Sequence, residues 1–319
     1  MTVPLIRSTR AMVKHVKLKR YGNISLYRFL NIFFFNIKKD EIIGRANGVS
    51  YNMLLATFPA IIFLFTLIPY VTVYFPAINR DSIMRFLGEL MPHSMYEVIS
   101  STVLDIISNQ RGGLLTFGFF FALFLATNGM MALMRAFNAC YKTVDKRNVW
   151  RMRLTATGLT LMLALVVFLA ILLLVVGQIA INYVTGHLQD FSDLNLDSFT
   201  LYFFLFLRFA VIFIVFFLTI SFIYYFGPAV HYNWKFFSIG SWVATLACLG
   251  VSYGFSYYVT NFGSYNKVYG SIGALIALMI WVQMLIVVLL IGYEINASLH
   301  YGMKIQGIGF YKKKKTKKK

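Results

Sequence analysis

Four stretches of this chain are long, apolar and almost free of charged residues, and they limit its fold more than any other feature does. They cover residues 113–126, 154–184, 201–226 and 270–293. Apolar runs of this length are too long for the interior of a soluble domain and predict transmembrane helices. The composition agrees, because 59% of the residues are hydrophobic, against about 45–50% in ordinary soluble domains. The chain is therefore expected to be an integral membrane protein.

Six membrane spans can be placed, since crossing about 30 Å of hydrocarbon takes about 20 apolar residues. Between the first two spans, residues 77–110 mix apolar and charged side chains at the spacing of two amphipathic helices lying at the membrane surface. The predicted fold is all-α, a polytopic membrane helix bundle with six transmembrane helices and additional amphipathic surface helices. The spans are expected near residues 50–75, 113–133, 154–184, 201–226, 237–259 and 271–295.

The distribution of lysine and arginine predicts the orientation of the bundle. Basic residues are concentrated in the first 45 residues, the loop 142–153 and the tail 312–319. In the loops after the first and third predicted spans, carboxylates offset or outnumber the basic residues. Positive segments resist translocation, so these three segments are expected on one side, with both termini in the cytoplasm. The net charge of +19 is then a marker of topology and gives no reason to expect a specific nucleic-acid partner.

Three parts of the chain follow from this organisation. Residues 1–45 form a basic cytoplasmic arm with an interfacial amphipathic helix, residues 46–301 form the transmembrane domain, and residues 302–319 form a lysine-rich cytoplasmic tail. The arm lacks the pattern of a cleaved signal peptide, so Met1 is expected to be retained. Anionic lipid headgroups are the expected partners of the arm and the tail, although the tail charges could equally serve topology and solubility alone. Envelope proteins are further candidate partners.

No catalytic, metal or cofactor site is expected from the sequence. The histidines are dispersed, and Cys140 and Cys248 are predicted at a span end and within a span, so neither a disulfide nor a metal site is indicated. The sequence also lacks a glycine-rich loop followed by Lys and Ser or Thr, which would bind ATP. Asp40, Glu41, Asp145 and Glu294 with scattered histidines do not form an acid–base or metal constellation, so the chain is not expected to be an enzyme.

Arg208 is a charged residue at membrane depth, about 10 Å inside the outer end of the fourth predicted span. Such a residue usually faces the bundle interior or a watery cavity. Two interpretations are open: Arg208 binds an anionic group such as a lipid phosphate, or it is a structural residue that bonds neighbouring helices or extends outward. Asn128 could line the same cavity, or form a hydrogen bond between helices.

The first span has a polar start, with Tyr51 and Asn52 shortly before Pro59. Proline bends a helix, and polar groups near it can line a cavity, so Tyr51 and Asn52 are candidate substrate-binding residues. Tyr257 and Tyr265 are further candidates, although an interfacial aromatic belt would also supply them. In the fifth span, Gly250 and Gly254 have the spacing of a close helix contact.

Glu294 is a carboxylate inside a span, near the inner end of the sixth helix. A structural salt bridge and a role in proton coupling are both open interpretations. Its expected partners are basic residues of the cytoplasmic face, namely Arg135, Arg147 or Arg153. The residues expected to have structural or coupling roles are Glu294, Asn296, Arg135, Arg147, Asn138, Pro59 and Gly270.

Three segments of the chain carry distinctive motifs. They are ANGVSYNMLLATFP at 46–59, MALMRAFNACY at 131–141 with Arg147, and YYVTNF at 257–262 followed by YNKVYGSIG at 265–273, Trp281 and GYEINA at 292–297. Together these segments resemble the YihY/BrkB family of membrane proteins. The resemblance covers about residues 40–301 and implies a six-spanning protein of the bacterial plasma membrane. Family members are sometimes described as virulence factor BrkB or as ribonuclease BN, and some are connected with lipid or envelope export. This chain departs from the pattern at Asn47, Asn52 and its lysine tail, which leaves any substrate open.

The expected function is that of a transporter or translocation factor for an anionic amphipathic molecule such as a lipid. Arg208 and the polar start of the first span would line its path. The alternative is a non-transporting membrane scaffold or envelope-assembly partner, whose basic arms recruit partners or lipid. Ribonuclease activity is the third and least favoured function, because the sequence lacks a group of acidic residues and histidines that could catalyse the reaction.

Overall fold

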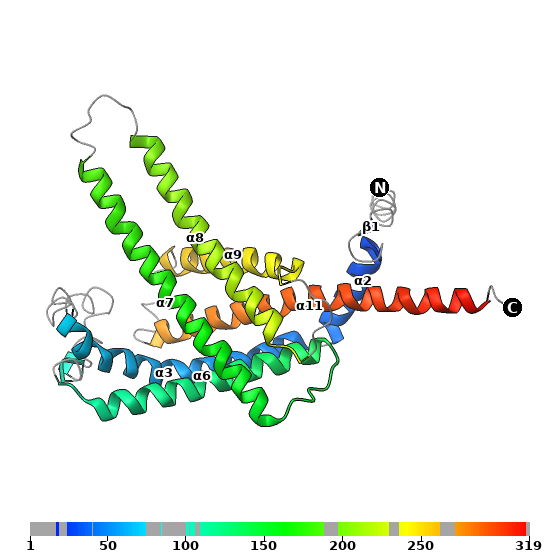
Figure 1. The fold of residues 1–319 in the computed structure, drawn as a ribbon, viewed down its shortest axis with the longest axis horizontal. Helices are drawn as coiled ribbons and strands as arrows, with labels where there is room; N and C mark the ends of the chain where they lie inside the picture. The colour runs from blue at the N-terminus through cyan, green and yellow to red at the C-terminus, as the bar shows by residue number, and fades with distance from the viewer. Residues whose placement is uncertain are drawn as a thin grey trace.

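The computed structural model describes residues 17–18, 24–39, 41–74, 84, 100–101, 103–105, 109–187, 197–229, 236–261 and 272–316 (Figure 1). Long helices dominate this part of the chain, and six of them are long and apolar enough to cross a membrane. The predicted all-α membrane bundle is therefore confirmed. The helices are α2 (Leu26–Lys39), α3 (Ile42–Tyr74), α6 (Gly112–Cys140), α7 (Val149–His187), α8 (Asp197–Phe226), α9 (Ile239–Asn261) and α11 (Ile272–Thr316).

The candidate membrane spans follow these helices closely but not identically. They are Ile42–Tyr70, Gly112–Cys140, Val149–Leu169, Phe209–Phe226, Ile239–Val259 and Leu275–Met303. Helix α11 continues well past its span and includes much of the lysine-rich tail, so that its C-terminal part extends beyond the other helices in Figure 1. The predicted surface helices of residues 77–110 fall largely outside the described residues.

Helix α3 begins at Ile42, eight residues before the start that was predicted for the first span. Hydropathy places the start too late because Arg45 and Asn47 interrupt the apolar run before Ser50. The helix nevertheless continues, since its own backbone accepts the polar side chains: Ser50 donates to the carbonyl of Ala46, and Asn52 to that of Gly48, both at 2.8 Å. The buried residues Ala46 and Val49 meanwhile join the core.

The N-terminal arm is docked onto the bundle through α11. A short antiparallel pair, β1 (Lys17–Leu18) and β2 (Ile24–Ser25), precedes α2. Ser25 caps α2 by accepting a hydrogen bond from the backbone N–H of Arg28 at 3.3 Å. Ile24 is fully buried against Gly302, where a Cβ atom would lie 2.7 Å from the Ile24 side chain. The glycine of α11 thus makes room for the arm.

The most deeply buried part of the core is an aromatic cluster that joins α6, α8 and α11. The rings of Phe137 and Tyr293 stack at 4.3 Å between centroids, and Tyr224 meets both rings edge-on. The hydroxyl of Tyr224 donates to the carbonyl of Leu289 at 2.6 Å. By contrast, α7 and α8 pack against each other and cross the other helices obliquely (Figure 1). The described part of α7 presents many apolar side chains on its surface, as expected of helices that face lipid.

Helices α9 and α11 approach each other most closely at Gly240 and Gly292. A Cβ atom on Gly240 would lie 2.2 Å from the carbonyl oxygen of Gly292 and 2.6 Å from the Asn296 side chain. The close contact predicted at Gly250 and Gly254 is wrong, since no neighbouring helix has a described atom within 4 Å of a Cβ built on either glycine. Spacing alone did not reveal which glycines of α9 face a neighbour.

Gly240→Ala is therefore expected to destabilise the protein by about 2 kcal/mol or more, because the methyl group meets backbone and cannot be accommodated by a side-chain rotation. Gly250→Ala is the matched control and should be neutral or stabilising by up to about 1 kcal/mol, since alanine favours a helix. Thermal unfolding of the purified proteins in one detergent measures both changes. An equal response of the two variants would contradict the assignment of the close contact.

Candidate functional site

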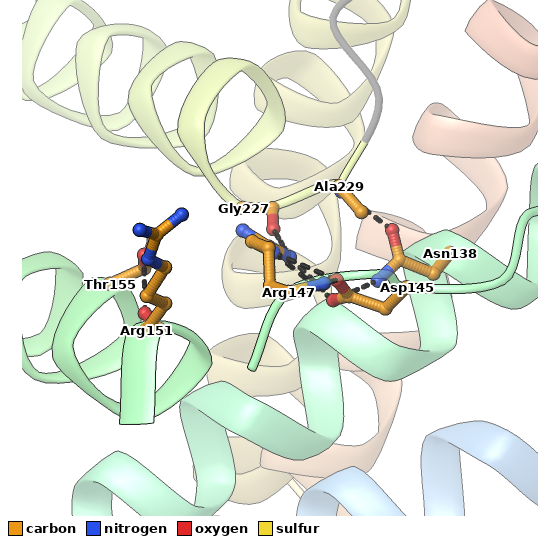
Figure 2. A network of polar contacts seen from close by, with 7 residues as sticks. All are labelled: Asn138, Asp145, Arg147, Arg151, Thr155, Gly227 and Ala229. Carbon is orange, nitrogen blue, oxygen red and sulfur yellow. Dashed lines mark hydrogen bonds and ion pairs between the residues drawn. The ribbon is translucent and has the colours of Figure 1, made fainter. Parts of the chain in front are cut away.

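A clamp of polar residues joins the α6–α7 loop to the chain segment after α8, and we call it the Asp145 clamp (Figure 2). Arg147 donates to the carboxylate of Asp145 from Nε and Nη2 at 2.8–3.1 Å, and Asn138 donates to it at 3.0 Å. Arg147 Nη2 also donates to the carbonyl of Gly227 at 2.9 Å, and the N–H of Ala229 donates to Asn138 Oδ1 at 2.8 Å. One ion pair therefore fixes two loops that are distant in sequence.

The charge of Asp145 is stabilised within this clamp. Burial by itself would raise the pKa of its carboxyl group, but the hydrogen bonds and positive charge of Arg147, with the hydrogen bond from Asn138, lower the pKa below its usual value of 3.8. The side chains of Arg147 and Asp145 are only 20% and 16% exposed. Asp145 is thus ionised at neutral pH and holds the loops as an acceptor of hydrogen bonds.

A second set of polar residues joins α2, the end of α6 and α11, and we call it the Glu294 cluster: the buried residues Asn36, Glu294 and Ser298, with the exposed residue Lys142. Glu294 is fully buried, and its Oε1 accepts hydrogen bonds from Asn36 and Ser298, both at 2.8 Å. Lys142 Nζ donates to Asn36 Oδ1 at 3.3 Å. A carboxylate, an amide, a hydroxyl and an ammonium group thus lie in one connected network.

Lys142, which belongs to this network, has an unusual backbone conformation. Its φ of 51° lies in the left-handed region, where glycine is favoured. Its N–H and that of Thr143 satisfy the last carbonyls of α6, at Ala139 and Asn138. The ammonium group lies 5.4 Å from the ring centroid of Tyr301. The turn thereby directs a positive charge over α11.

Two of the three arginines that were predicted as partners of Glu294 make other contacts, and the third is exposed. Arg147 belongs to the Asp145 clamp, the guanidinium of Arg153 lies 4.3 Å above the ring of Phe124, and Arg135 is exposed on α6. Glu294 is bonded to Asn36 of the arm helix. Sequence reasoning missed Asn36 because it treated that helix as a free amphipathic segment, although a single asparagine on an apolar face was an available signal.

Asn296 satisfies the start of α9. Its Oδ1 accepts the N–H of Gly240 at 2.9 Å, and its Nδ2 donates to Ser238 Oγ at 2.8 Å. The first backbone N–H groups of a helix have no partner within the helix, so a side chain from α11 supplies one here. Asn296 therefore fixes the junction of α9 and α11 beside the close contact of their glycines.

A third set of polar residues is exposed or partly exposed, and we call it the α3–α11 polar face: Asn47, Tyr51, Asn52 and Gln283. Gln283 Nε2 donates to Asn47 Oδ1 at 2.8 Å across the two helices. Tyr51 is 63% exposed, and Asn52 is partly exposed. All four residues lie within candidate membrane spans. Gln283 was missed at the sequence level, although a glutamine inside an apolar span was a visible signal.

The other predicted site residues are distributed over the bundle. Arg208 lies in α8, but the structure does not describe its side chain. Tyr265 and Gly270 lie outside the described residues. Asn128 is partly buried in α6, Pro59 is buried in α3, and Tyr257 is 64% exposed towards the end of α9. No group of three or more His, Cys, Asp or Glu residues is placed to hold a metal ion within the described ranges.

Comparison with known proteins gives matches along most of the chain. The profile of a family described as virulence factor BrkB matches residues 33–316. The ribonuclease-like protein YfkH of Bacillus subtilis (strain 168) is 32% identical over 277 residues, which cover 87% of this chain and 97% of YfkH. The UPF0761 membrane protein MS0032 of Mannheimia succiniciproducens is 21% identical, covering 88% of this chain and 93% of that protein. No solved structure matches the chain.

The matched segments include most of the buried polar residues described above. Asn36, Asn138, Asp145, Glu294 and Asn296 all lie between residues 33 and 316. The resemblance first noted in the segments 46–59, 131–141 and 257–297 is therefore confirmed at the level of the whole chain.

Removing the acceptor of the Asp145 clamp should destabilise the fold. Asp145→Ala leaves Arg147 and Asn138 without their shared acceptor in a half-buried position, for an expected loss of about 2 kcal/mol. Asp105→Ala is the control, because the Asp105–Arg111 pair has 53% and 45% exposed side chains and should contribute at most about 1 kcal/mol. Thermal unfolding of both variants tests this difference, and equal losses would contradict the role of the clamp.

The same clamp should weaken in acid. Because the folded-state pKa of Asp145 is lowered below 3.8, its contribution is complete above that value and is lost as the pH falls through the folded pKa. The difference in thermal midpoint between the native protein and Asp145→Asn should thus stay constant from about pH 7 to about pH 5 and shrink below about pH 4. A difference that shrinks already near neutral pH would contradict this assignment.

Proposed function

The chain belongs to the virulence factor BrkB family of membrane proteins, and from this premise we propose that it is a transporter or translocation factor for an anionic amphipathic molecule such as a phospholipid. The observation that carries the proposal is the α3–α11 polar face. Three residues with side-chain amides and one tyrosine are exposed or partly exposed there, on two helices that are otherwise apolar enough to span the membrane. Such a surface suits the polar part of a substrate better than it suits lipid tails.

The amides of Asn47 and Gln283 need polar partners beyond each other. Asn47 and Gln283 satisfy only part of their hydrogen-bonding capacity through each other. A polar group without partners in hydrocarbon costs several kcal/mol, so an exposed amide at membrane depth is stable only beside water, a headgroup or another polar group. Asn52 lies about 15 Å along α3 from Ile42, at 1.5 Å per residue. The polar face therefore reaches well into the span.

Arg208 is proposed to supply the positive charge that recognises an anionic substrate. It is a charged residue in α8, within the long apolar stretch that ends at Phe226. A cation held among apolar helices attracts a phosphate more strongly than one in water does. Tyr51 and Asn52 would contact the uncharged polar part of the same molecule.

The acidic residues that an enzymatic role would need are used in other ways. Asp145 is an acceptor in a loop clamp, and Glu294 is fully buried beside Asn36 and Ser298. We therefore propose that the protein is not a ribonuclease, although the name of its relative from Bacillus subtilis contains that word.

The orientation is proposed from the charges at one end of the bundle. Basic residues lie at the start of α3, the end of α6 and the start of α7, at Arg45, Lys142, Lys146 and Arg151. Positive loops are retained on the cytoplasmic side. Its relatives include bacterial membrane proteins, so we place this end, with both termini, in the cytoplasm of a bacterium and the bundle in its inner membrane.

Transbilayer movement of a fluorescent phosphatidylglycerol in proteoliposomes tests the proposal. The native protein should accelerate the movement, and Asn47→Leu/Gln283→Leu should slow it about tenfold, since a loss of about 1.4 kcal/mol at the barrier suffices for that. Tyr51→Phe should slow it less. Tyr253→Phe is the matched control, because Tyr253 is 79% exposed on α9, a helix that supplies none of the four residues of the polar face.

Two further variants address the charge. Arg208→Ala should abolish the acceleration and Arg208→Lys should retain part of it, because a lysine keeps the charge but loses the planar bidentate geometry. Insertion and thermal stability are checked for every variant. If the correctly inserted native protein moves the lipid no faster than empty liposomes do, lipid translocation is rejected.

A further inference from the structure

Helix α2 presents two chemically different faces. Its exposed residues, single or in adjacent pairs, recur every three to four positions. They therefore form one stripe along the helix, which we call the outer stripe of α2. The opposite face packs onto α11. The outer stripe consists of Tyr27, Arg28, Asn31, Phe34, Phe35, Lys38 and Lys39.

The inner face of α2 fixes the helix firmly. Asn36 is 3% exposed and bonds Glu294, Ser298 and Lys142. The preceding β2 residue Ile24 is buried against α11. Because one asparagine bonds to three residues and the start of the helix is capped and packed, α2 has a defined rotation about its axis. The outer stripe therefore has a defined direction as well.

The composition of the stripe is aromatic and basic. Phe34 and Phe35 are 58% and 62% exposed, which leaves two large apolar side chains adjacent on the surface. Arg28, Lys38 and Lys39 are exposed with them, and α2 contains no carboxylate. The ammonium of Lys39 lies 5.8 Å from the ring centroid of Phe35. This is the chemistry of an interface between hydrocarbon and anionic headgroups.

The position of α2 fits the same partner. It ends at Lys39, and the first candidate span begins at Ile42. A helix joined so closely to the end of a span lies at the level of the membrane surface. There, exposed phenylalanines can enter the upper acyl region while the lysine and arginine side chains extend to the phosphates.

We propose that the outer stripe of α2 binds anionic phospholipids of the adjoining leaflet. Arg28, Lys38 and Lys39 contact the phosphates, and Phe34 and Phe35 insert among the acyl chains. The bound lipids hold the arm at the membrane surface while Asn36 holds it to the bundle. This site is separate from the α3–α11 polar face and does not depend on transport.

The experiment uses the full chain, delipidated in detergent, and follows thermal unfolding as dioleoyl phosphatidylglycerol or dioleoyl phosphatidylcholine is added. Phosphatidylglycerol should raise the midpoint more than phosphatidylcholine does. In Arg28→Gln/Lys38→Gln/Lys39→Gln, the phosphatidylglycerol concentration for half the effect should rise about a hundredfold, since each of the three lost surface cations weakens binding about fivefold. Phe34→Ser/Phe35→Ser should weaken the effect of both lipids, and glycerol phosphate, which lacks acyl chains, should not reproduce it.

A control of equal charge makes the test specific. Arg135→Gln/Lys146→Gln/Arg151→Gln removes the same number of positive charges from exposed positions outside α2 and should leave the phosphatidylglycerol response close to that of the native protein. An equal loss in both triple variants would show a general effect of net charge and overturn the proposal. It would also be overturned if the α2 variant kept its lipid response but lost binding of an RNA oligonucleotide that the native protein bound.

Discussion

The rest of this bundle depends on how polar groups are satisfied at the end where α6 stops and α9 begins. Water is scarce between packed membrane helices, so each buried donor or acceptor needs a protein partner. The segment Gly292–Ala297 of α11 provides several of them: Gly292 admits α9, Tyr293 stacks on Phe137, Glu294 binds the arm helix, and Asn296 satisfies the start of α9. One short segment thus fixes the positions of three other elements.

Two groups of polar residues extend this arrangement into the loops and the arm. The Asp145 clamp joins the α6–α7 loop to the segment after α8, and the Glu294 cluster joins α2 to α11. Both use charged or amide side chains from positions far apart in sequence. A polar network of this kind has strict geometry, because every member must find its partners at the same time. It therefore gives this end of the bundle a defined structure that apolar packing alone would specify less strictly.

The functional proposals rest on polar residues that are exposed or partly exposed and lie on helices bonded to this end of the bundle. The α3–α11 polar face lies on two helices whose inner sides belong to the core, and the outer stripe of α2 lies on a helix whose inner side is bonded to Glu294. In both cases, burial of one face determines the direction of the other. The bonded end thereby determines the direction of both surfaces to which the proposals assign binding.

The sequence by itself determined the class of fold, because six long apolar segments in one chain have no stable alternative to membrane-spanning helices. It also singled out Glu294, Asn296, Asn138 and Arg147, since polar residues in or beside apolar spans are conspicuous. It did not determine their partners: hydropathy carries no information about which faces meet, so Asn36, Lys142 and Gln283 were missed and close packing was assigned to Gly250 rather than Gly240. Only the tertiary structure decided these pairings, because they join residues as far as 262 positions apart through the crossing and rotation of whole helices.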